Sequence, residues 1–184
     1  MNTRTYYLDL LKKHISNSKM IAHSVASEAV LRALARKFGE DEDLWGIAGL
    51  LHDIDVEITN ADPKKHAIVG AEMLANELPA EAIEAIKMHN EQATGMERST
   101  RFQHALAAGE TITGLIFATA LVYPDKKIES VKVKSITKRM KEKIFAASVN
   151  RETILECQKL GLTIDEFAEI ALNALRPIAT EIGF

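Results

Sequence analysis

Cysteine, proline, glycine and aromatic residues are all scarce in this 184-residue chain, which has one cysteine, four prolines, nine glycines and 5% aromatic residues. The single Cys157 excludes an internal disulfide and is typical of a reducing compartment. No apolar run approaches the roughly 20 residues that cross a bilayer. The first residues, Met1 to Tyr7, lack the apolar core of a signal peptide. We therefore expect a cytoplasmic protein that does not contact a membrane.

The scarcity of helix-breaking residues, together with the spacing of the apolar ones, favours helices along almost the whole chain. Hydrophobic residues make up 47% of the sequence, enough for a continuous core in one domain, 1–184. We predict an all-α helical bundle without a sheet, with loops at 55–65 and 91–100 that border a functional site. The helices are expected at about 5–16, 19–38, 42–51, 66–78, 80–88, 101–123, 133–145, 151–160 and 163–182.

An imidazole and a carboxylate stand side by side at the end of an apolar helix, in Gly49-Leu50-Leu51-His52-Asp53-Ile54-Asp55. Helix packing favours apolar groups at such positions, so a charge buried there has to be compensated. A bound cation is a compensation that also supplies chemistry. His52 and Asp53 are therefore predicted to be metal ligands.

Four further polar side chains lie on helix faces that are otherwise apolar, and each is expected to point inward. They are His23, His66, His89 and Glu110. Any one of these histidines alone is better explained as a core residue bonded to a backbone carbonyl. Together, four inward histidines and two inward carboxylates would be costly to desolvate without a shared cation, which favours a metal site. His14 and His104 have polar neighbours and are expected to be solvated or to support the site indirectly.

The order of these residues resembles the H…HD…D signature of the HD-domain metal-dependent phosphohydrolases. The resemblance rests on His23, on the segment 49–55, and on an acid preceding Ile112-Thr113-Gly114-Leu115-Ile116. It covers a metal-site core at about 19–121, and the C-terminal helices at about 133–182 resemble those of small bacterial and archaeal predicted hydrolases in this superfamily. It implies His23, His52 and Asp53 as metal ligands, with Glu110 where the family usually has Asp.

The resemblance leaves the number of metal ions open. Some HD subfamilies hold a second ion through additional histidines, with the HD aspartate bridging the two ions. His66 and His89 resemble those histidines, although Asn90 stands where such proteins often have another. With a single ion, His66 and His89 would bind substrate phosphate or relay protons. One or two divalent transition metal ions are therefore expected, chosen from Fe, Mn, Co, Ni and Zn, because these suit imidazole and carboxylate ligands.

Such an ion lowers the pKa of bound water, so that hydroxide can attack phosphorus near neutral pH. The candidate catalytic residues that would orient this water are Asp53 and Asp55. Asp55 also fits a second interpretation, a plain cap or turn residue at the start of the loop that follows.

Basic residues are concentrated between 126 and 151, where nine basic and two acidic residues give a net charge of +7, against −10 for the rest of the chain. Lys134, Lys138 and Lys141 share one helix face and are candidates for binding a substrate phosphate. A solvated basic helix is the alternative explanation for most of these lysines. Extended nucleic-acid binding is not expected, because aromatic side chains are not interleaved with the charges.

The predicted function is hydrolysis of a phosphomonoester or phosphodiester in a nucleotide or another small phosphorylated metabolite. The alternative is a non-catalytic metal or nucleotide sensor of the same fold, which the Glu110 departure favours. A small phosphorylated substrate is the expected partner. Self-association into a homo-oligomer is compatible with the sequence.

Overall fold

The computed structural model describes residues 2–184, and the regular elements within this range are all helices, which confirms the predicted all-α class. The α-helices are α1 (Arg4–His14), α2 (Ser18–Phe38), α3 (Glu42–Leu51), α4 (Ile68–Met73), α5 (Ala80–His89), α6 (Glu91–Thr94), α7 (Arg101–Leu121), α8 (Val133–Met140), α9 (Arg151–Leu155) and α10 (Ile164–Leu175). Short 3₁₀ turns lie between or after them, at η1 (Ile128–Ser130), η2 (Glu156–Leu160) and η3 (Arg176–Ile178).

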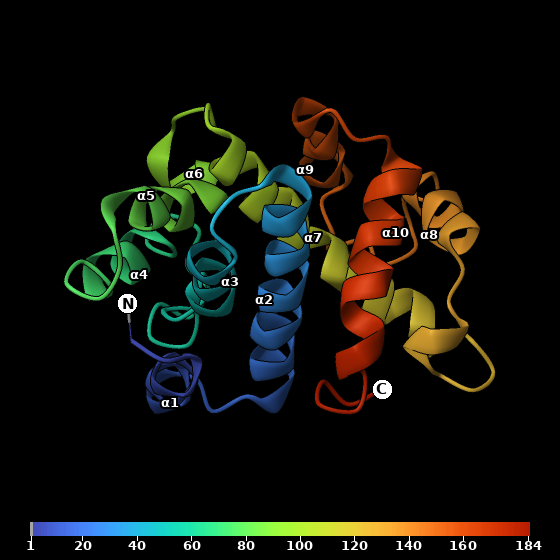
Figure 1. Ribbon diagram of the computed structural model, residues 1–184, viewed down its shortest axis with the longest axis horizontal. Helices are drawn as coiled ribbons and strands as arrows, with labels where there is room; N and C mark the ends of the chain where they lie inside the picture. Colours follow the sequence, from blue (N-terminus) through green and yellow to red (C-terminus); the bar gives the residue numbers. More distant parts are fainter. Residues whose placement is uncertain (1) are drawn as a thin grey trace.

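Helix α2 occupies the middle of the molecule and packs most extensively against α3 and then α7. In Figure 1, α2 and α3 lie side by side and α7 runs behind them, with α4 and α5 on one side and α8 and α10 on the other. The two central helices can approach closely because a glycine lies at their contact. A Cβ atom on Gly49 would lie only 2.8 Å from the backbone oxygen of Ser27. This approach brings the end of α3, and with it His52, towards α2.

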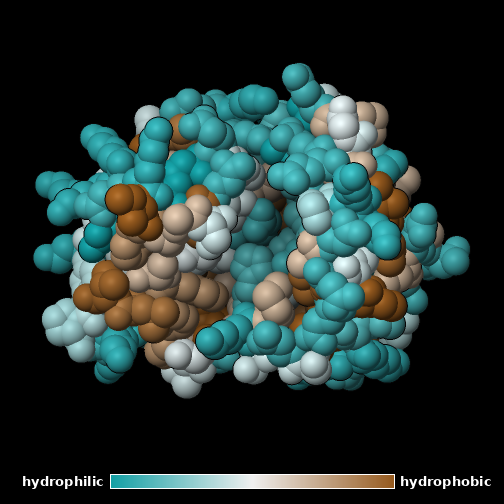
Figure 2. All heavy atoms as spheres, turned by 180° about the vertical axis from the view of Figure 1, so that it is seen from behind, coloured by the Kyte–Doolittle hydropathy of each residue, from teal (hydrophilic) through white to brown (hydrophobic). Residues whose placement is uncertain are grey.

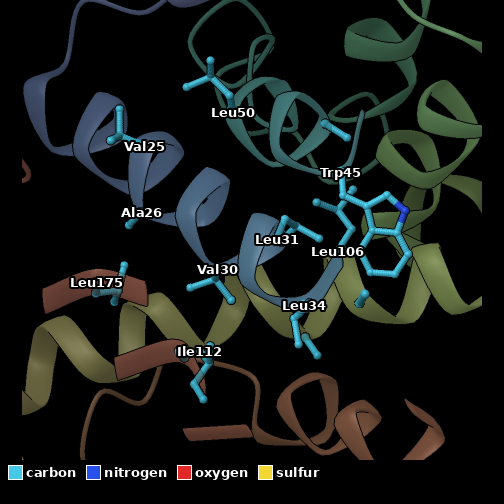
Figure 3. Packing of buried hydrophobic residues seen from close by; sticks show 14 of the residues in the cluster. Val25, Ala26, Val30, Leu31, Leu34, Trp45, Leu50, Leu106, Ile112 and Leu175 are labelled. Carbon is cyan, nitrogen blue, oxygen red and sulfur yellow. The ribbon is translucent and has the colours of Figure 1, made fainter. Parts of the chain in front are cut away.

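The hydrophobic core fills the space between these helices. Figure 3 shows side chains of α2, α3 and α7 gathered there, among them Leu31, Leu50 and Leu106, which are fully buried. Burial of one such side chain stabilises the fold by about 1.5–3 kcal/mol. The core therefore fixes the backbones of the three helices that carry most of the predicted site.

Helix α2 illustrates how local sequence sets the boundaries. The Asn17 side chain accepts a hydrogen bond from the backbone N–H of Lys19 at the N-terminal end. The helix ends at Gly39, whose φ of +70° is the left-handed conformation that glycine adopts readily. These signals are visible in the sequence, and the predicted helix 19–38 agrees with the observed one to within one residue.

Two predicted helices are shorter than expected around the site. The helix predicted at 66–78 covers only Ile68–Met73, because Ala67 has a φ of +75° and its N–H bonds to the carboxylate of Asp55 rather than to a helical carbonyl. The helix predicted at 133–145 ends at Met140. The stretch that follows it contains Ala146 with a φ of +45°, which interrupts helical geometry.

Two further predictions differ in detail. The predicted loop 91–100 contains one helical turn, α6, which ends at Gly95. The helix predicted at 163–182 ends at Leu175 and continues as the 3₁₀ turn η3. Pro177 lies in that turn and has no backbone N–H to continue the α-helical pattern.

Within residues 2–184, one helix is long and apolar enough to cross a membrane, which differs from the prediction that no apolar run approaches that length. This helix is α7, and 67% of its most apolar window is buried inside the protein. The core position of α7 accounts for its composition.

Candidate metal centre

Asp53 lies between two pairs of histidines that come from different parts of the chain. Its Oδ2 atom is 3.5 Å from Nε2 of His23 on α2 and 3.3 Å from Nε2 of His52, which follows α3. Its Oδ1 atom is 3.1 Å from Nε2 of His66, in the turn before α4, and 3.4 Å from Nε2 of His89, the last residue of α5. Two groups of three potential metal ligands therefore share one carboxylate. We call them the first triad (His23, His52 and Asp53) and the second triad (Asp53, His66 and His89).

Backbone carbonyls fix the orientation of two of the imidazoles. Nδ1 of His52 lies 2.8 Å from the carbonyl oxygen of Gly49, and Nδ1 of His89 lies 2.5 Å from that of Ile86. A carbonyl oxygen can only accept, so each Nδ1 carries the proton and donates it. In the neutral ring, the lone pair of each Nε2 atom therefore faces Asp53.

Side chains fix the other two imidazoles. Nδ1 of His66 donates to Oδ1 of Asp55, at 2.7 Å. Nδ1 of His23 lies 2.8 Å from Oγ1 of Thr113, and that hydroxyl donates its own proton to the carbonyl oxygen of Glu110. Thr113 thus accepts from His23, and Nε2 of both rings is left as an acceptor or ligand atom.

The four Nε2 atoms meet in pairs at hydrogen-bond distance with no proton between them in the neutral state. Nε2 of His23 is 3.2 Å from that of His52, and Nε2 of His66 is 3.1 Å from that of His89. Two facing lone pairs repel each other unless a proton or a cation lies beside both. Hydrogen-bonded Nδ1 atoms behind metal-directed Nε2 atoms are the usual arrangement of histidine ligands. The donor set therefore fits divalent ions, and imidazole with carboxylate suits Fe, Mn, Co, Ni and Zn.

Burial and charge shift the pKa values of these groups in opposite directions. Burial lowers the pKa of His23 and of His89. Burial also acts on Asp53 and His66, but neighbouring groups outweigh it. The histidines around Asp53 hold the pKa of its carboxyl well below the ordinary value, and hydrogen bonds to Asp53 and Asp55 raise the pKa of His66 to about 10. A cation would compete with a proton for the same Nε2 lone pair of His66.

Glu110 borders the triads without belonging to either of them. Its Oε2 atom lies 3.7 Å from Nε2 of His23, and its Oε1 atom accepts a short hydrogen bond from the hydroxyl of Thr111. Burial raises the pKa of Glu110. The structure thus places this acid on the wall of the site, farther from the histidines than Asp53.

Asp55 lies behind His66. In addition to the bond from His66, its Oδ2 atom accepts the backbone N–H groups of Ala67 and Gly70, at 2.9 and 2.8 Å. Asp55 is fully buried and both its oxygens accept hydrogen bonds, which agrees with the second interpretation of Asp55 as a cap; a part in orienting water stays a prediction. Asp55 orients His66 and caps the start of α4.

Asn90 also supports this side of the site. Its side-chain amide donates to the carbonyl oxygens of Pro63 and His66, at 3.0 and 2.9 Å. Asn90 stands where related two-metal proteins often have another histidine. In this structure it holds the loop that carries His66.

A cavity of about 330 Å³, here called the inner cavity, opens beside His23, His89 and Glu110 and is also bordered by Ser148 and Asn150. Figure 2 shows a hollow near the middle of one face of the molecule, with hydrophilic residues at its floor. An adjoining cavity of about 580 Å³, here called the outer cavity, is lined by Lys141.

The other two predicted substrate-binding lysines do not line either cavity. Lys138 lies 3.8 Å from the carboxylate of Glu142, with a side chain that is 75% exposed, and Lys134 is exposed. His14 is one of the two histidines that were not predicted to be metal ligands, and it is exposed as expected.

A buried ionic network beside His89 was missed by sequence reasoning. Arg98 forms an ion pair of 2.5 Å with Glu156, and it donates to the carbonyl oxygens of Met88 and His89 at 2.8 and 3.2 Å. His104, for which a solvated position was considered, is buried, with Nδ1 2.7 Å from Glu156. The network ties the end of α5 to η2. Glu156 lies 58 residues from Arg98 in the sequence, and no local pattern signals such a contact.

The family model of the HD domain matches residues 20–136, which include both triads. The matched range contains His23, His52 and Asp53, the residues on which the resemblance rests. No solved structure matches the chain.

Proposed function

The chain belongs to the HD-domain family, and on this basis we propose that it is a metal-dependent hydrolase of phosphate esters. The observation that carries the proposal is the position of Asp53, whose two oxygens face two separate pairs of histidines. An aspartate in that position can bridge two ions. We therefore favour two metal ions over one.

The two triads would hold the ions as His23, His52 and Asp53 on one side, and Asp53, His66 and His89 on the other. Bound divalent ions of this kind lower the pKa of water and stabilise negative charge on a phosphoryl group. The protein supplies the fixed orientation of the imidazoles. Gly49, Ile86, Thr113 and Asp55 hold the four Nδ1 protons away from the site.

Glu110 is our candidate for moving a proton. Glu110 lines the inner cavity, and its raised pKa suits a carboxylate that takes a proton during attack by water. The short bond from Thr111 holds Oε1 and leaves Oε2 available. Ser148 and Asn150 also line this cavity and can donate hydrogen bonds to phosphate oxygens.

We propose a nucleotide or another small phosphorylated metabolite as the substrate. The inner cavity is of the size that takes a phosphate group together with the atoms next to it. Glu110 lies outside both triads, as would suit a non-catalytic sensor, and the test below therefore includes this alternative as one of its outcomes.

The proposal is tested by purifying the protein with Mn, Co or Ni and assaying a panel of nucleotides and generic phosphate esters. We expect turnover that a chelator abolishes and that His52→Ala removes. His14→Ala changes an exposed histidine and serves as the matched control. Metal binding without turnover of any ester would favour the sensor. Absence of both would refute the metal assignment.

A further inference from the structure

The outer cavity adjoins the inner cavity on the side of the C-terminal helices. It lies among residues of α8, α9 and α10, and its volume of about 580 Å³ falls in the range of small-molecule sites. Val149 and Asn150 line both cavities. A ligand whose phosphate lies beside His89 and Glu110 can therefore extend past Asn150 into the outer cavity.

The segment that joins the two cavities is held in a defined shape. The guanidinium of Arg151 donates to the carbonyl oxygens of Ala146 and Val149, each at 2.6 Å, and to that of Phe145. These bonds satisfy carbonyls that no helix satisfies. The segment also rests against α7, where a Cβ atom on Gly114 would lie 3.2 Å from Cγ2 of Val149. The segment that both cavities share is thus anchored on both sides.

The lining of the outer cavity combines apolar surface with cationic groups. Met140, Leu155 and Ile164 contribute apolar side chains. Lys141 and Lys143 contribute amines, and within residues 2–184 neither has a carboxylate within ion-pair distance. Glu142 between them pairs with Lys138 and Arg139 instead.

The lining also contains two acids, Glu152 and Asp165, which balance the two lysines in formal charge, so that with Arg151 the lining carries a net charge of +1. Arg151 lines the cavity too, but its two terminal nitrogens donate to backbone carbonyls and its Nε is buried. A ligand that suits this lining has apolar surface, hydroxyl groups for the acids, and an anionic group for the lysines.

We infer that the outer cavity binds the part of the substrate beyond the scissile phosphate, and that this part carries a second anionic group held by Lys141 and Lys143. The inference rests on the proposed function, which places the scissile phosphate in the inner cavity. A nucleoside diphosphate has every feature that the lining requires. A monophosphate lacks the second anion, so the two lysines discriminate between these classes of ligand.

The test measures binding of ADP and of AMP by titration calorimetry to the metal-loaded Glu110→Gln protein, which is expected to hold its ions without turning the nucleotides over, and the lysine variants are made in the same background. We expect Lys141→Ala and Lys143→Ala each to weaken ADP binding about tenfold, the effect of losing one charge-assisted contact. AMP binding should change by less than about twofold. Lys132→Ala removes a lysine of the same basic stretch outside the cavity, and should leave both ligands unaffected.

Three outcomes would overturn the inference. The first is unchanged ADP binding in both variants. The second is an equal loss for ADP and AMP, because the lysines would then contact the scissile phosphate. The third is a comparable loss in Lys132→Ala, Lys134→Ala or Lys138→Ala, because attraction to the basic stretch as a whole would then explain binding. Since binding is measured directly, the result stands apart from the turnover that tests the proposed function.

Discussion

Oδ1 of Asp55 lies 2.7 Å from Nδ1 of His66, and this contact determines which nitrogen of His66 faces Asp53. The other oxygen of Asp55 accepts two backbone N–H groups, so the carboxylate is fixed in turn. Asp55 therefore controls the second triad without belonging to it.

Asp55→Asn should weaken metal binding at the second triad about 10–100-fold, which is the usual cost of losing a group that orients a ligand. The amide nitrogen of asparagine would face either His66 or the two backbone N–H groups, and it can accept from neither. Titration with Mn or Co while metal content is measured would detect the loss. Asp9→Asn, at an exposed position on α1, is the control. Unchanged affinity in Asp55→Asn would mean that the contact does not matter for binding.

Glu110→Gln should keep its metal ions but lose about 10²–10⁴-fold in kcat, because Glu110 lies outside both triads and is proposed to move a proton. The amide has nearly the same shape and cannot take the proton. Metal analysis and steady-state kinetics on the same preparation separate the two properties. A loss of bound metal in step with activity would instead make Glu110 a ligand, as the family resemblance implies.

The buried pair of Arg98 and Glu156 should make stability depend on pH. Burial disfavours the charged form of Glu156, but hydrogen bonds from Arg98 and His104 outweigh it and lower the pKa of Glu156. The folded protein therefore binds this proton less readily than the unfolded chain. Its stabilising effect is present above the ordinary pKa of a glutamate and is lost as the pH falls through the folded value.

Glu156→Gln should consequently destabilise the protein by about 1–3 kcal/mol at pH about 7, since it removes the more buried of the two carboxylate partners of Arg98 and leaves only the half-exposed Glu91. The difference from the wild type should shrink below pH about 4. Urea unfolding at both pH values gives the comparison, with exposed Glu129→Gln as control. A difference independent of pH would show that the charge of Glu156 contributes nothing.

The parts of the structure that were predictable depend on local patterns. Apolar spacing and the caps at both ends predict helix α2, and a short sequence motif identifies the couplet of His52 and Asp53. The inward direction of His89, the last residue of α5, also followed from its apolar neighbours. These signals are sufficient because helix geometry fixes where each side chain points.

The parts that were not predictable depend on contacts between distant segments. The bond from His66 to Asp55 requires Ala67 to leave helical geometry, and the propensity of alanine suggests the opposite. The outer cavity depends on where α8 ends and on the bonds of Arg151 to a non-helical segment. Tertiary contacts decide such positions, and a single sequence does not display them.

The central claim is that Asp53 joins two metal sites, and metal content of the purified protein tests it most directly. We predict about two divalent ions per chain in the wild type, about one in His23→Ala and in His89→Ala, and almost none in Asp53→Ala. Each histidine variant keeps one intact triad, whereas loss of Asp53 removes a ligand from both. A wild-type protein with about one ion per chain, and an unchanged value in His89→Ala, would contradict the account.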